Sequence, residues 1–348
     1  MTADHGRPHG MTFGPGPPKS GLFRRLRSAA LGAERGPTVM LPAARVLSGV
    51  SAASPKKHRR SQLELHNIHT STPTHANAVS ILDDIIDDTR ELVEQRKSKT
   101  PIAELQQRPF YDDREPLSLV EALKEQGLSF IAEAKKASPS KGVIREPFDP
   151  ASIAQQYAQH GAAAISVLTE PQHFQGSLEH MAWIRAHVPE TPLLRKDFII
   201  DPYQLVEARA VGADAVLLIA TALDAGRLSD LHAAATELGL SCLVEVYTEE
   251  DLDMIDWNQV NILGVNNRDL HTFEVDIENS LRIFDQTPKS VGRIAESGLS
   301  DPETLVRLRK AGVNGVLIGE HLMRAEHPGE ALSQLRAKGK KIAAKQAS

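Results

Sequence analysis

The sequence contains only one cysteine, Cys242, among its 348 residues. No disulfide can form within the chain, and a zinc site built from several cysteines is excluded. Aromatic residues make up only 4% of the chain, so the core must be built mainly from Ala, Val, Leu and Ile. No apolar run reaches the roughly 18 residues of a membrane-spanning helix, so we expect no membrane partner.

Motifs for common cofactors are also missing. The phosphate-binding pattern Gly-x-x-x-x-Gly-Lys-Ser/Thr does not occur. The 14 histidines are scattered, and no pair of them falls at the ends of predicted strands, where a catalytic metal would need them. We therefore expect no metal. What is present, 41% hydrophobic and 24% charged residues, is typical of a soluble globular protein.

Charge divides the chain into two parts. Residues 1–75 contain 11 Lys or Arg against 3 Asp or Glu, whereas the remainder is acidic and brings the net charge to −5. The first part is rich in Pro, Gly, Ser and His, so we predict a disordered basic extension. Its Arg-rich stretch Phe23–Val50 resembles an organelle transit peptide, but we favour an unstructured tail or a start codon placed too far upstream. The acidic remainder argues against a nucleic-acid partner.

From residue 76 to residue 348 the pattern is regular. Apolar residues at helical spacing predict a helix over Ala76–Lys97, and a second, short helix is expected over Leu117–Glu125. Eight apolar, β-rich runs follow, and helical segments separate them. The predicted strands are Phe130–Lys136, Ala163–Thr169, Pro192–Phe198, Ala215–Ala220, Leu240–Tyr247, Ile262–Asn267, Arg293–Ser297 and Gly315–Gly319.

The connecting segments carry helix start and stop signals. Starts are predicted at Asp149-Pro150, Asp201-Pro202, Asp224, Thr248-Glu249 and Asp301-Pro302, and stops at Gly161, Gly212, Gly239 and Gly312. Alternating strands and helices imply a parallel sheet, and eight such units predict a (β/α)₈ TIM barrel with extra N-terminal helices. The alternative is an open doubly wound sheet, which usually carries a Gly-rich dinucleotide loop after its first strand. The segment Lys135–Gly142 contains no such loop.

Active sites of such barrels lie at the carboxyl ends of the strands. Ionisable or polar residues are predicted at five of these ends: Glu133 and Lys135, Lys196, Glu245, Asn266 and Arg268, Glu296 and Ser297. Each has a structural explanation, such as a surface pair of Lys196 with Asp197. Glu133 and Lys135 could likewise form a purely structural ion pair. Because charges inside a barrel are costly unless they are paired or used, the whole set favours one converging site.

Small residues follow the last two predicted strands. Ser297 and Gly298 follow the seventh strand, and Gly319 ends the eighth. Such residues let backbone N–H groups approach a phosphate, and a short helix starting near Glu320 would add its positive end. Ser138, after the first strand, could add a hydroxyl group. Ordinary glycine turns are the alternative.

These strand ends lie in seven sequence blocks: Ile131–Gly142, Phe174–Ser177, Leu194–Phe198, Leu243–Val246, Gly264–Leu270, Ala295–Gly298 and Leu317–Gly319. In this order the blocks resemble the signatures of the indole-3-glycerol-phosphate synthase family, over roughly Ser80 to Leu335. The resemblance implies a lyase of tryptophan biosynthesis that needs no metal or organic cofactor. Its substrate would be the phosphosugar 1-(2-carboxyphenylamino)-1-deoxyribulose 5-phosphate, and its products indole-3-glycerol phosphate, CO₂ and water.

The resemblance also implies roles for individual residues. Lys196 would be the general acid of ring closure, and Glu245 the general base of dehydration. Lys135 would bind the substrate carboxylate and take part in proton transfer, while Glu133 and Asn266 orient these groups. Which lysine serves which step stays open. The other implied contacts are Arg268, Glu296 and Ser297 in the pocket, Phe174 and Phe198 at the aromatic ring, and Ser138, Ser297, Gly298 and Gly319 at the phosphate.

One position departs from many members of the family. After Gly319, where a small hydroxyl residue is frequent, this sequence has Glu320. A carboxylate beside the phosphate would repel it. We therefore expect the phosphate to bind backbone N–H groups there and Glu320 to turn outward.

Two alternatives stay open. Another phosphate-binding barrel enzyme, such as a phosphosugar isomerase, would usually use a carboxylate pair or a Cys–Asp pair. Cys242, however, lies early in a predicted strand, where a small core residue is expected. A non-catalytic phosphosugar-binding protein is the second alternative. We expect a cytoplasmic enzyme, or an organellar one if residues 1–75 act as a transit peptide, with neighbouring tryptophan-pathway enzymes as candidate partners.

Overall fold

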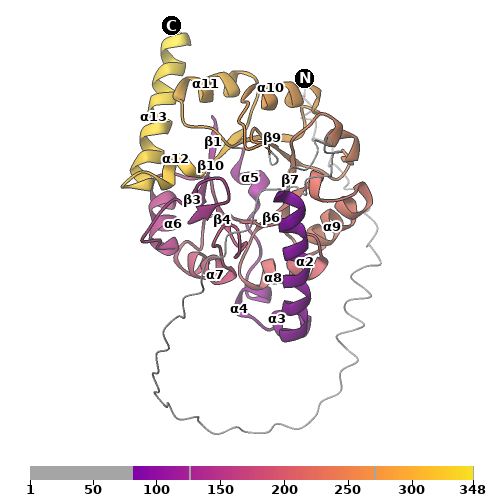
Figure 1. Ribbon diagram of the computed structural model, residues 1–348. Coiled ribbons are helices and arrows are strands. Elements are labelled where there is room, and N and C mark those ends of the chain that lie inside the picture. Colours follow the sequence, from indigo (N-terminus) through magenta and orange to yellow (C-terminus); the bar gives the residue numbers. More distant parts are fainter. Residues whose placement is uncertain (1–80, 125–126, 270–271, 348) are drawn as a thin grey trace, which may run out of the picture.

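The computed structural model describes residues 81–124, 127–269 and 272–347. Eight parallel strands close into a barrel with helices around it, which confirms the predicted TIM barrel (Figure 1). The strands are β1 (Ser129–Ala134), β4 (Ala164–Leu168), β5 (Leu193–Lys196), β6 (Ala215–Ile219), β7 (Ser241–Val246), β8 (Ile262–Asn266), β9 (Gly292–Glu296) and β10 (Gly315–Ile318). Pairing of β1 with both β4 and β10 closes the sheet. The predicted basic extension over residues 1–75 lies outside the described residues.

The helices that follow the strands begin and end largely where the sequence predicts. They are α6 (Pro150–Gln159), α7 (Leu178–His187), α8 (Pro202–Ala210), α9 (Ala225–Glu237), α10 (Glu278–Gln286), α11 (Pro302–Lys310), α12 (Glu320–Met323) and α13 (Pro328–Ala347). The side chains of Asp149, Asp201 and Asp301 accept backbone N–H groups at the starts of their helices. Glycine is required at the end of α8, because Gly212 has a φ of 86°.

Two connections differ from the prediction. The segment at Thr248-Glu249 begins only a short 3₁₀ helix, η2 (Glu250–Met254), instead of an α-helix. The Asp251 carboxylate accepts the backbone N–H groups of Tyr247 and Thr248, both at 2.8 Å, and thereby folds the chain into a turn against the strand end. A hairpin of β2 (Ala137–Ser138) and β3 (Gly142–Val143), which the sequence did not predict, follows β1.

The segment before the barrel contains more and shorter helices than predicted. Helix α2 (Ile81–Lys99) matches the predicted Ala76–Lys97, of which residues 76–80 lie outside the described part. Two short helices, α3 (Ile102–Leu105) and α4 (Pro109–Asp112), were not predicted. Helix α5 (Leu119–Ala122) is shorter than the predicted Leu117–Glu125, because the N–H of Leu117 binds Asp214 and Ser118 caps the helix.

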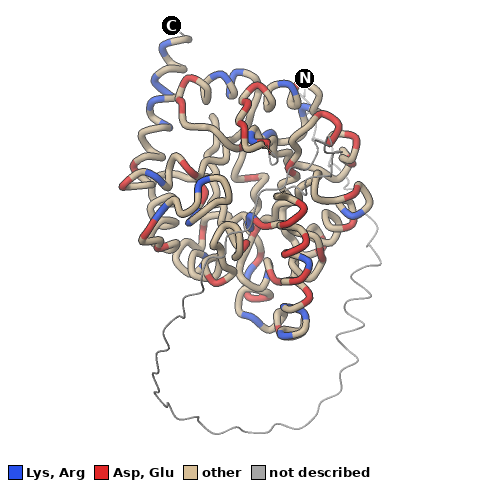
Figure 2. The backbone as a smooth tube through the Cα atoms, in the orientation of Figure 1, with Lys and Arg blue, Asp and Glu red and all other residues tan. Residues whose placement is uncertain are grey.

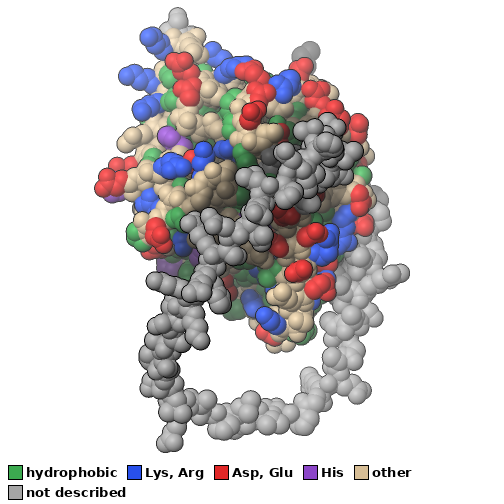
Figure 3. All heavy atoms as spheres, in the orientation of Figure 1, with side chains coloured by type: hydrophobic (Ala, Val, Ile, Leu, Met, Phe, Trp, Pro, Cys, Tyr) green, Lys and Arg blue, Asp and Glu red, His purple; other side chains and the backbone are tan. Residues whose placement is uncertain are grey.

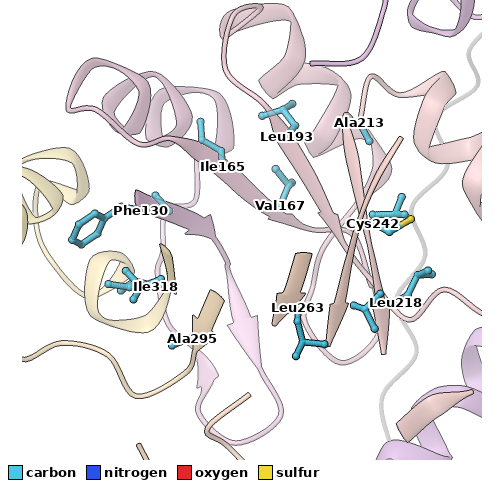
Figure 4. Packing of buried hydrophobic residues seen from close by; sticks show 14 of the residues in the cluster. Phe130, Ile165, Val167, Leu193, Ala213, Leu218, Cys242, Leu263, Ala295 and Ile318 are labelled. Carbon is cyan, nitrogen blue, oxygen red and sulfur yellow. The ribbon is translucent and has the colours of Figure 1, made fainter. Parts of the chain in front are cut away.

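The core has two layers, separated by the alternation of side chains along each strand. Outward-facing residues such as Val167, Leu218 and Leu263 pack against the surrounding helices (Figure 4). Inward-facing residues such as Leu194 and Leu243 fill the barrel interior. Polar residues of inward parity at the carboxyl ends of the strands therefore point into the mouth of the barrel.

Charge is unevenly spread over the described surface. Exposed lysines gather along α13, at the upper left of Figures 2 and 3. Helix α2 has Asp83 and Asp84 in its first turn and basic residues in its last turn, an order that complements the helix dipole. Within residues 81–347, apart from the two short gaps, no helix has the length and hydropathy needed to cross a membrane.

Candidate active site

The candidate polar side chains meet in one cavity at the carboxyl ends of the strands. Lys196 stands two residues after the inward-facing Leu194 on β5, and Glu245 stands two residues after Leu243 on β7, so both point inward. The cavity has a volume of about 340 Å³, which suits a substrate-sized ligand. The candidate residues that line it are Glu133, Lys135, Ser138, Phe174, Lys196, Phe198, Glu245, Asn266, Arg268, Glu296, Ser297, Gly298 and Gly319.

Lys196 lies between two buried carboxylates. Its Nζ donates to Glu245 Oε2 at 2.6 Å and to Glu296 Oε2 at 2.9 Å. Burial by itself lowers the pKa of Lys196, but the charges of Glu245 and Glu296 outweigh it and raise the pKa above the ordinary value. The side chain is 17% exposed, so a ligand in the cavity can still reach the ammonium group.

A second lysine stands beside it in the cavity. Lys135 Nζ lies 2.6 Å from Glu133 Oε1, so the ion pair considered from the sequence is present. Both residues nevertheless line the cavity, which means that the pair also presents its charge to a ligand. Asn266 donates its side-chain N–H to Glu245 Oε1 at 3.2 Å and so holds that carboxylate in place.

Behind Lys196 lies a buried polar network that the sequence did not reveal. Arg195, which is fully buried, donates to Asp197 Oδ2 at 2.8 Å and reaches Glu207 on α8 at 3.4 Å. Thr169 donates to the same Asp197 oxygen at 2.6 Å. The alternative of a surface pair between Lys196 and Asp197 is therefore wrong, since Asp197 is buried and pairs with Arg195. This network fixes the strand end that carries Lys196.

The apolar end of the cavity is formed by aromatic and aliphatic side chains. The rings of Phe174 and Phe198 are 6.2 Å apart. Leu82 and Ile85 from α2 complete this wall, which the sequence analysis missed because the helix lies far from the strand ends along the chain. Their positions on the apolar face of α2 were the only available signal. A planar aromatic group can pack against such a wall.

The opposite end of the cavity is formed by the turns after β9 and β10. Ser297 and Gly298 both have positive φ, 68° and 73°. A side chain on Gly319 would place its Cβ 2.2 Å from Glu133 Oε1, so this glycine also makes room for Glu133. The predicted short helix after Gly319 is present as α12.

Glu320 does not simply turn outward to solvent. Its carboxylate accepts from Arg324 Nε at 3.0 Å and lies 3.9 Å from Arg268 Nη2. Two guanidinium groups therefore balance its charge at the rim of the cavity. Arg324 was not among the residues assigned from the sequence, although it lines the cavity too.

The described residues give less support to a metal site or to a cysteine nucleophile. Within them, no group of three or more His, Cys, Asp or Glu side chains is arranged to hold a metal ion. Cys242 is buried in the outer core layer, as expected of a small core residue, and burial raises the pKa of its thiol to about 12. A thiol in that state is a poor nucleophile.

The closed barrel and the lysine and glutamate side chains in the cavity at its strand ends define the class of the protein, a TIM barrel with a charged pocket. A family model described as indole-3-glycerol phosphate synthase matches residues 82–335. The chain belongs to this family, and it is accordingly a carboxy-lyase of tryptophan biosynthesis that acts on a phosphosugar-like substrate.

Curated relatives agree with this assignment. The chain is 87% identical over 269 residues to the indole-3-glycerol phosphate synthase of Salinibacter ruber (strain DSM 13855 / M31), which covers 77% of this chain and 100% of the relative. It is 47% identical over 261 residues to the enzyme of the same name from Campylobacter jejuni (strain 81-176), covering 73% and 99%. Tryptophan synthase subunit alpha from Legionella pneumophila, at 14% identity and a TM-score of 0.50, covers 65% of this chain and 100% of its own, and shares the fold.

Proposed function

We propose that Lys196 is the general acid and Glu245 the general base in the conversion of 1-(2-carboxyphenylamino)-1-deoxyribulose 5-phosphate to indole-3-glycerol phosphate. The observation that carries the proposal is the position of the Lys196 ammonium, in contact with two buried carboxylates within the cavity. An acid and a base in direct contact can exchange protons with a substrate held between them. The charge of Glu245 also raises the pKa of Lys196.

Ring closure is the first step that needs help. The aromatic carbon that carries the carboxylate attacks the ketone carbon of the sugar, and Lys196 gives a proton to the ketone oxygen as the new bond forms. Loss of CO₂ then returns the electron pair of the broken bond to the ring, where the cationic iminium of the intermediate accepts it. This internal electron sink explains how the reaction proceeds without a cofactor.

Dehydration completes the reaction. Glu245 removes a proton from the intermediate, and the hydroxyl group formed from the ketone leaves as water after it has received a proton from a lysine. Lys135 and Lys196 both reach the cavity, and either ammonium group can supply this proton. Glu133 and Asn266 orient the two active pairs through the contacts of 2.6 and 3.2 Å described above.

The remaining lining residues position the substrate. We place its aromatic ring against Phe174 and Phe198, and its phosphate at the turns of Gly298 and Gly319 with the hydroxyl of Ser138. Backbone N–H groups at such turns suit a phosphate. Lys135 would hold the substrate carboxylate until it leaves as CO₂. The further pocket contacts are Arg268, Glu296 and Ser297.

The test is the rise in indole fluorescence when enzyme and substrate are mixed. Lys196→Met removes the acid while keeping side-chain length, and turnover should fall by at least about 10²-fold while substrate still binds. Lys124→Met is the matched control, because Lys124 is exposed and, within the described part of the chain, forms an ion pair with Glu121 alone. Full activity of Lys196→Met would reject the assigned role. Turnover should also survive exhaustive chelator treatment.

We further propose that residues 1–75 are an extension outside the catalytic body. The family match begins only at residue 82, and the Salinibacter relative is covered completely by 269 residues of this chain. Mass spectrometry of the mature N-terminus tests this proposal, since cleavage near residue 76 would leave an active enzyme. We expect a cytoplasmic enzyme that can meet neighbouring pathway enzymes, and cleavage by an organelle would instead identify a transit peptide.

A further inference from the structure

Carboxylates outnumber ammonium groups in the depth of the cavity. Lys135 pairs with Glu133, which leaves Lys196 facing both Glu245 and Glu296. The three glutamates are each no more than 3% exposed. If all three were ionised, the two lysines would leave one buried negative charge without compensation. Such a charge is costly, and a buried carboxyl group in this position takes up a proton instead.

Among the described residues, the other charged groups that line the cavity form no ion pair with Glu296. Arg268 donates to the carbonyl oxygen of Phe273 and faces Glu320, and Arg324 donates to Glu320, so both arginines are held at the rim. Asp197 pairs with Arg195, and His321 is exposed. Asn266 is neutral and donates to Glu245, not to Glu296.

Glu296 is the carboxyl group with the poorest set of donors. Its Oε2 accepts from Lys196, but its Oε1 is buried and accepts no hydrogen bond from any residue that the structure describes. That oxygen lies where a side chain of Gly264 would be, since a Cβ on Gly264 would stand 2.3 Å from it. Glu245, in contrast, is held by both Lys196 and Asn266. A proton is therefore best placed on Glu296.

We propose that Glu296 is a positioning residue that carries a proton in the free enzyme, so that Glu245 is the only ionised carboxylate in contact with Lys196. The proposal rests on the proposed roles of Lys196 and Glu245. An ammonium group that faces one carboxylate gives up its proton more readily than one that faces two. The proton on Glu296 thus keeps Lys196 acidic enough to protonate the substrate ketone.

The pKa of Glu296 agrees with this geometry. Burial and the nearby charge of Glu245 raise the pKa of Glu296 to about 8, although Lys196 acts in the opposite direction. Glu296 therefore loses its proton in mildly alkaline solution and becomes a second negative charge beside Lys196. Turnover should fall as the pH rises through this range.

Infrared spectroscopy of the substrate-free enzyme tests the protonation directly. The carbonyl stretch of a protonated carboxylic acid should be present at pH 7, should disappear as the pH rises past about 8, and should be absent in Glu296→Gln. Because this measurement needs no turnover, it is independent of the roles proposed for Lys196 and Glu245. Absence of the band from the wild-type enzyme, or its persistence in Glu296→Gln, would overturn the proposal.

The pH profile of kcat tests the consequence. Glu296→Gln has a neutral side chain of the same shape, so the alkaline fall in kcat, measured relative to this variant's own kcat at pH 7, should move upward by at least about one pH unit. Gly264→Ala, whose Cβ would stand 2.3 Å from Glu296 Oε1 and so displace this carboxyl group, should lower kcat even at pH 7. An unchanged alkaline fall in Glu296→Gln would contradict the proposal, whereas an active Lys196→Met variant would contradict the proposed function instead.

Discussion

His173 and Asp88 join helix α2 to the loop that follows β4. Nε2 of His173 lies 2.8 Å from Oδ2 of Asp88. The same loop continues into Phe174, and α2 contributes Leu82 and Ile85 to the wall of the cavity. The contact between His173 and Asp88 therefore connects the two segments that form the apolar end of the cavity.

Asp88→Asn should weaken substrate binding without affecting the chemistry. A partly exposed pair of this kind contributes about 0.5 to 1 kcal/mol, so KM should rise about two- to fivefold while kcat stays unchanged. Steady-state kinetics by indole fluorescence measure both constants. Asp87→Asn is the control, because Asp87 lies on the same helix but is exposed and forms its ion pair, among the residues described, with Arg90. Equal KM values for the two variants would show that the pair does not hold the wall.

Asp214 should contribute to the stability of the folded protein and not to its catalytic activity. It is fully buried at the start of β6, at the end of the barrel opposite the cavity, and it binds the guanidinium groups of Arg114 and Arg185. Asp214→Asn removes the negative charge that pairs with the buried Arg185 and the partly exposed Arg114, and should lower the free energy of unfolding by about 3 to 5 kcal/mol. Urea denaturation measures this loss, and kcat/KM of the folded protein should be unchanged. Glu278→Gln, which breaks an exposed pair with Arg307, should have little effect.

The barrel could be predicted from sequence because its two side-chain layers leave a simple pattern. Each predicted strand agrees with the observed one to within two residues at either end. Lys196 and Glu245 could be identified as inward-facing because they share the parity of buried aliphatic residues on their own strands. The alternation of side chains along a strand and the caps of a helix depend on residues close together in the chain. A single sequence therefore contains the information needed to predict these elements.

The rest of the site depends on contacts between distant segments. Arg195 has outward parity, and nothing near it in the sequence indicates that it is fully buried, because one of its partners, Glu207, comes from the following helix. The wall formed by Leu82 and Ile85 depends on where α2 docks, which local periodicity does not determine. The order of the blocks indicated the active-site residues, whereas their supporting contacts required the three-dimensional structure.

Cys242 should be unreactive in the folded protein. Burial raises the pKa of its thiol to about 12, so almost no thiolate is present at pH 8, and the side chain is only 6% exposed. Labelling with a thiol reagent should therefore follow the rate of unfolding and should become rapid in denaturant. Cys242→Ala should keep full activity, since the thiol lies in the outer core layer. Rapid labelling of the native enzyme at pH 8 would contradict this burial.

Gly319 should serve the site in two ways that a pair of variants can separate. Alanine at this position would place its Cβ 2.2 Å from Glu133 Oε1 and 3.2 Å from Glu133 Cβ, so Glu133 must move and its pair with Lys135 must loosen. A displacement of this size should lower kcat/KM by about 10²-fold. Gly292→Ala is the control, because Gly292 is at the other end of a neighbouring strand and its nearest neighbour would be an ordinary 3.4 Å away.

A second variant distinguishes the two functions of Gly319, which are to leave room for Glu133 and to leave the phosphate site open. Glu133→Asp has a shorter side chain, so in combination with Gly319→Ala it should relieve the clash and recover part of the lost kcat/KM. A methyl group that only blocked the phosphate would be unaffected by that shortening, and the double variant would then be at least as slow as Gly319→Ala alone. Comparison of inorganic phosphate as an inhibitor of both variants completes the test, because a phosphate site left open binds phosphate equally well in each. Partial recovery with unchanged phosphate inhibition is the outcome we expect, since the closest contact of the added methyl group is with Glu133.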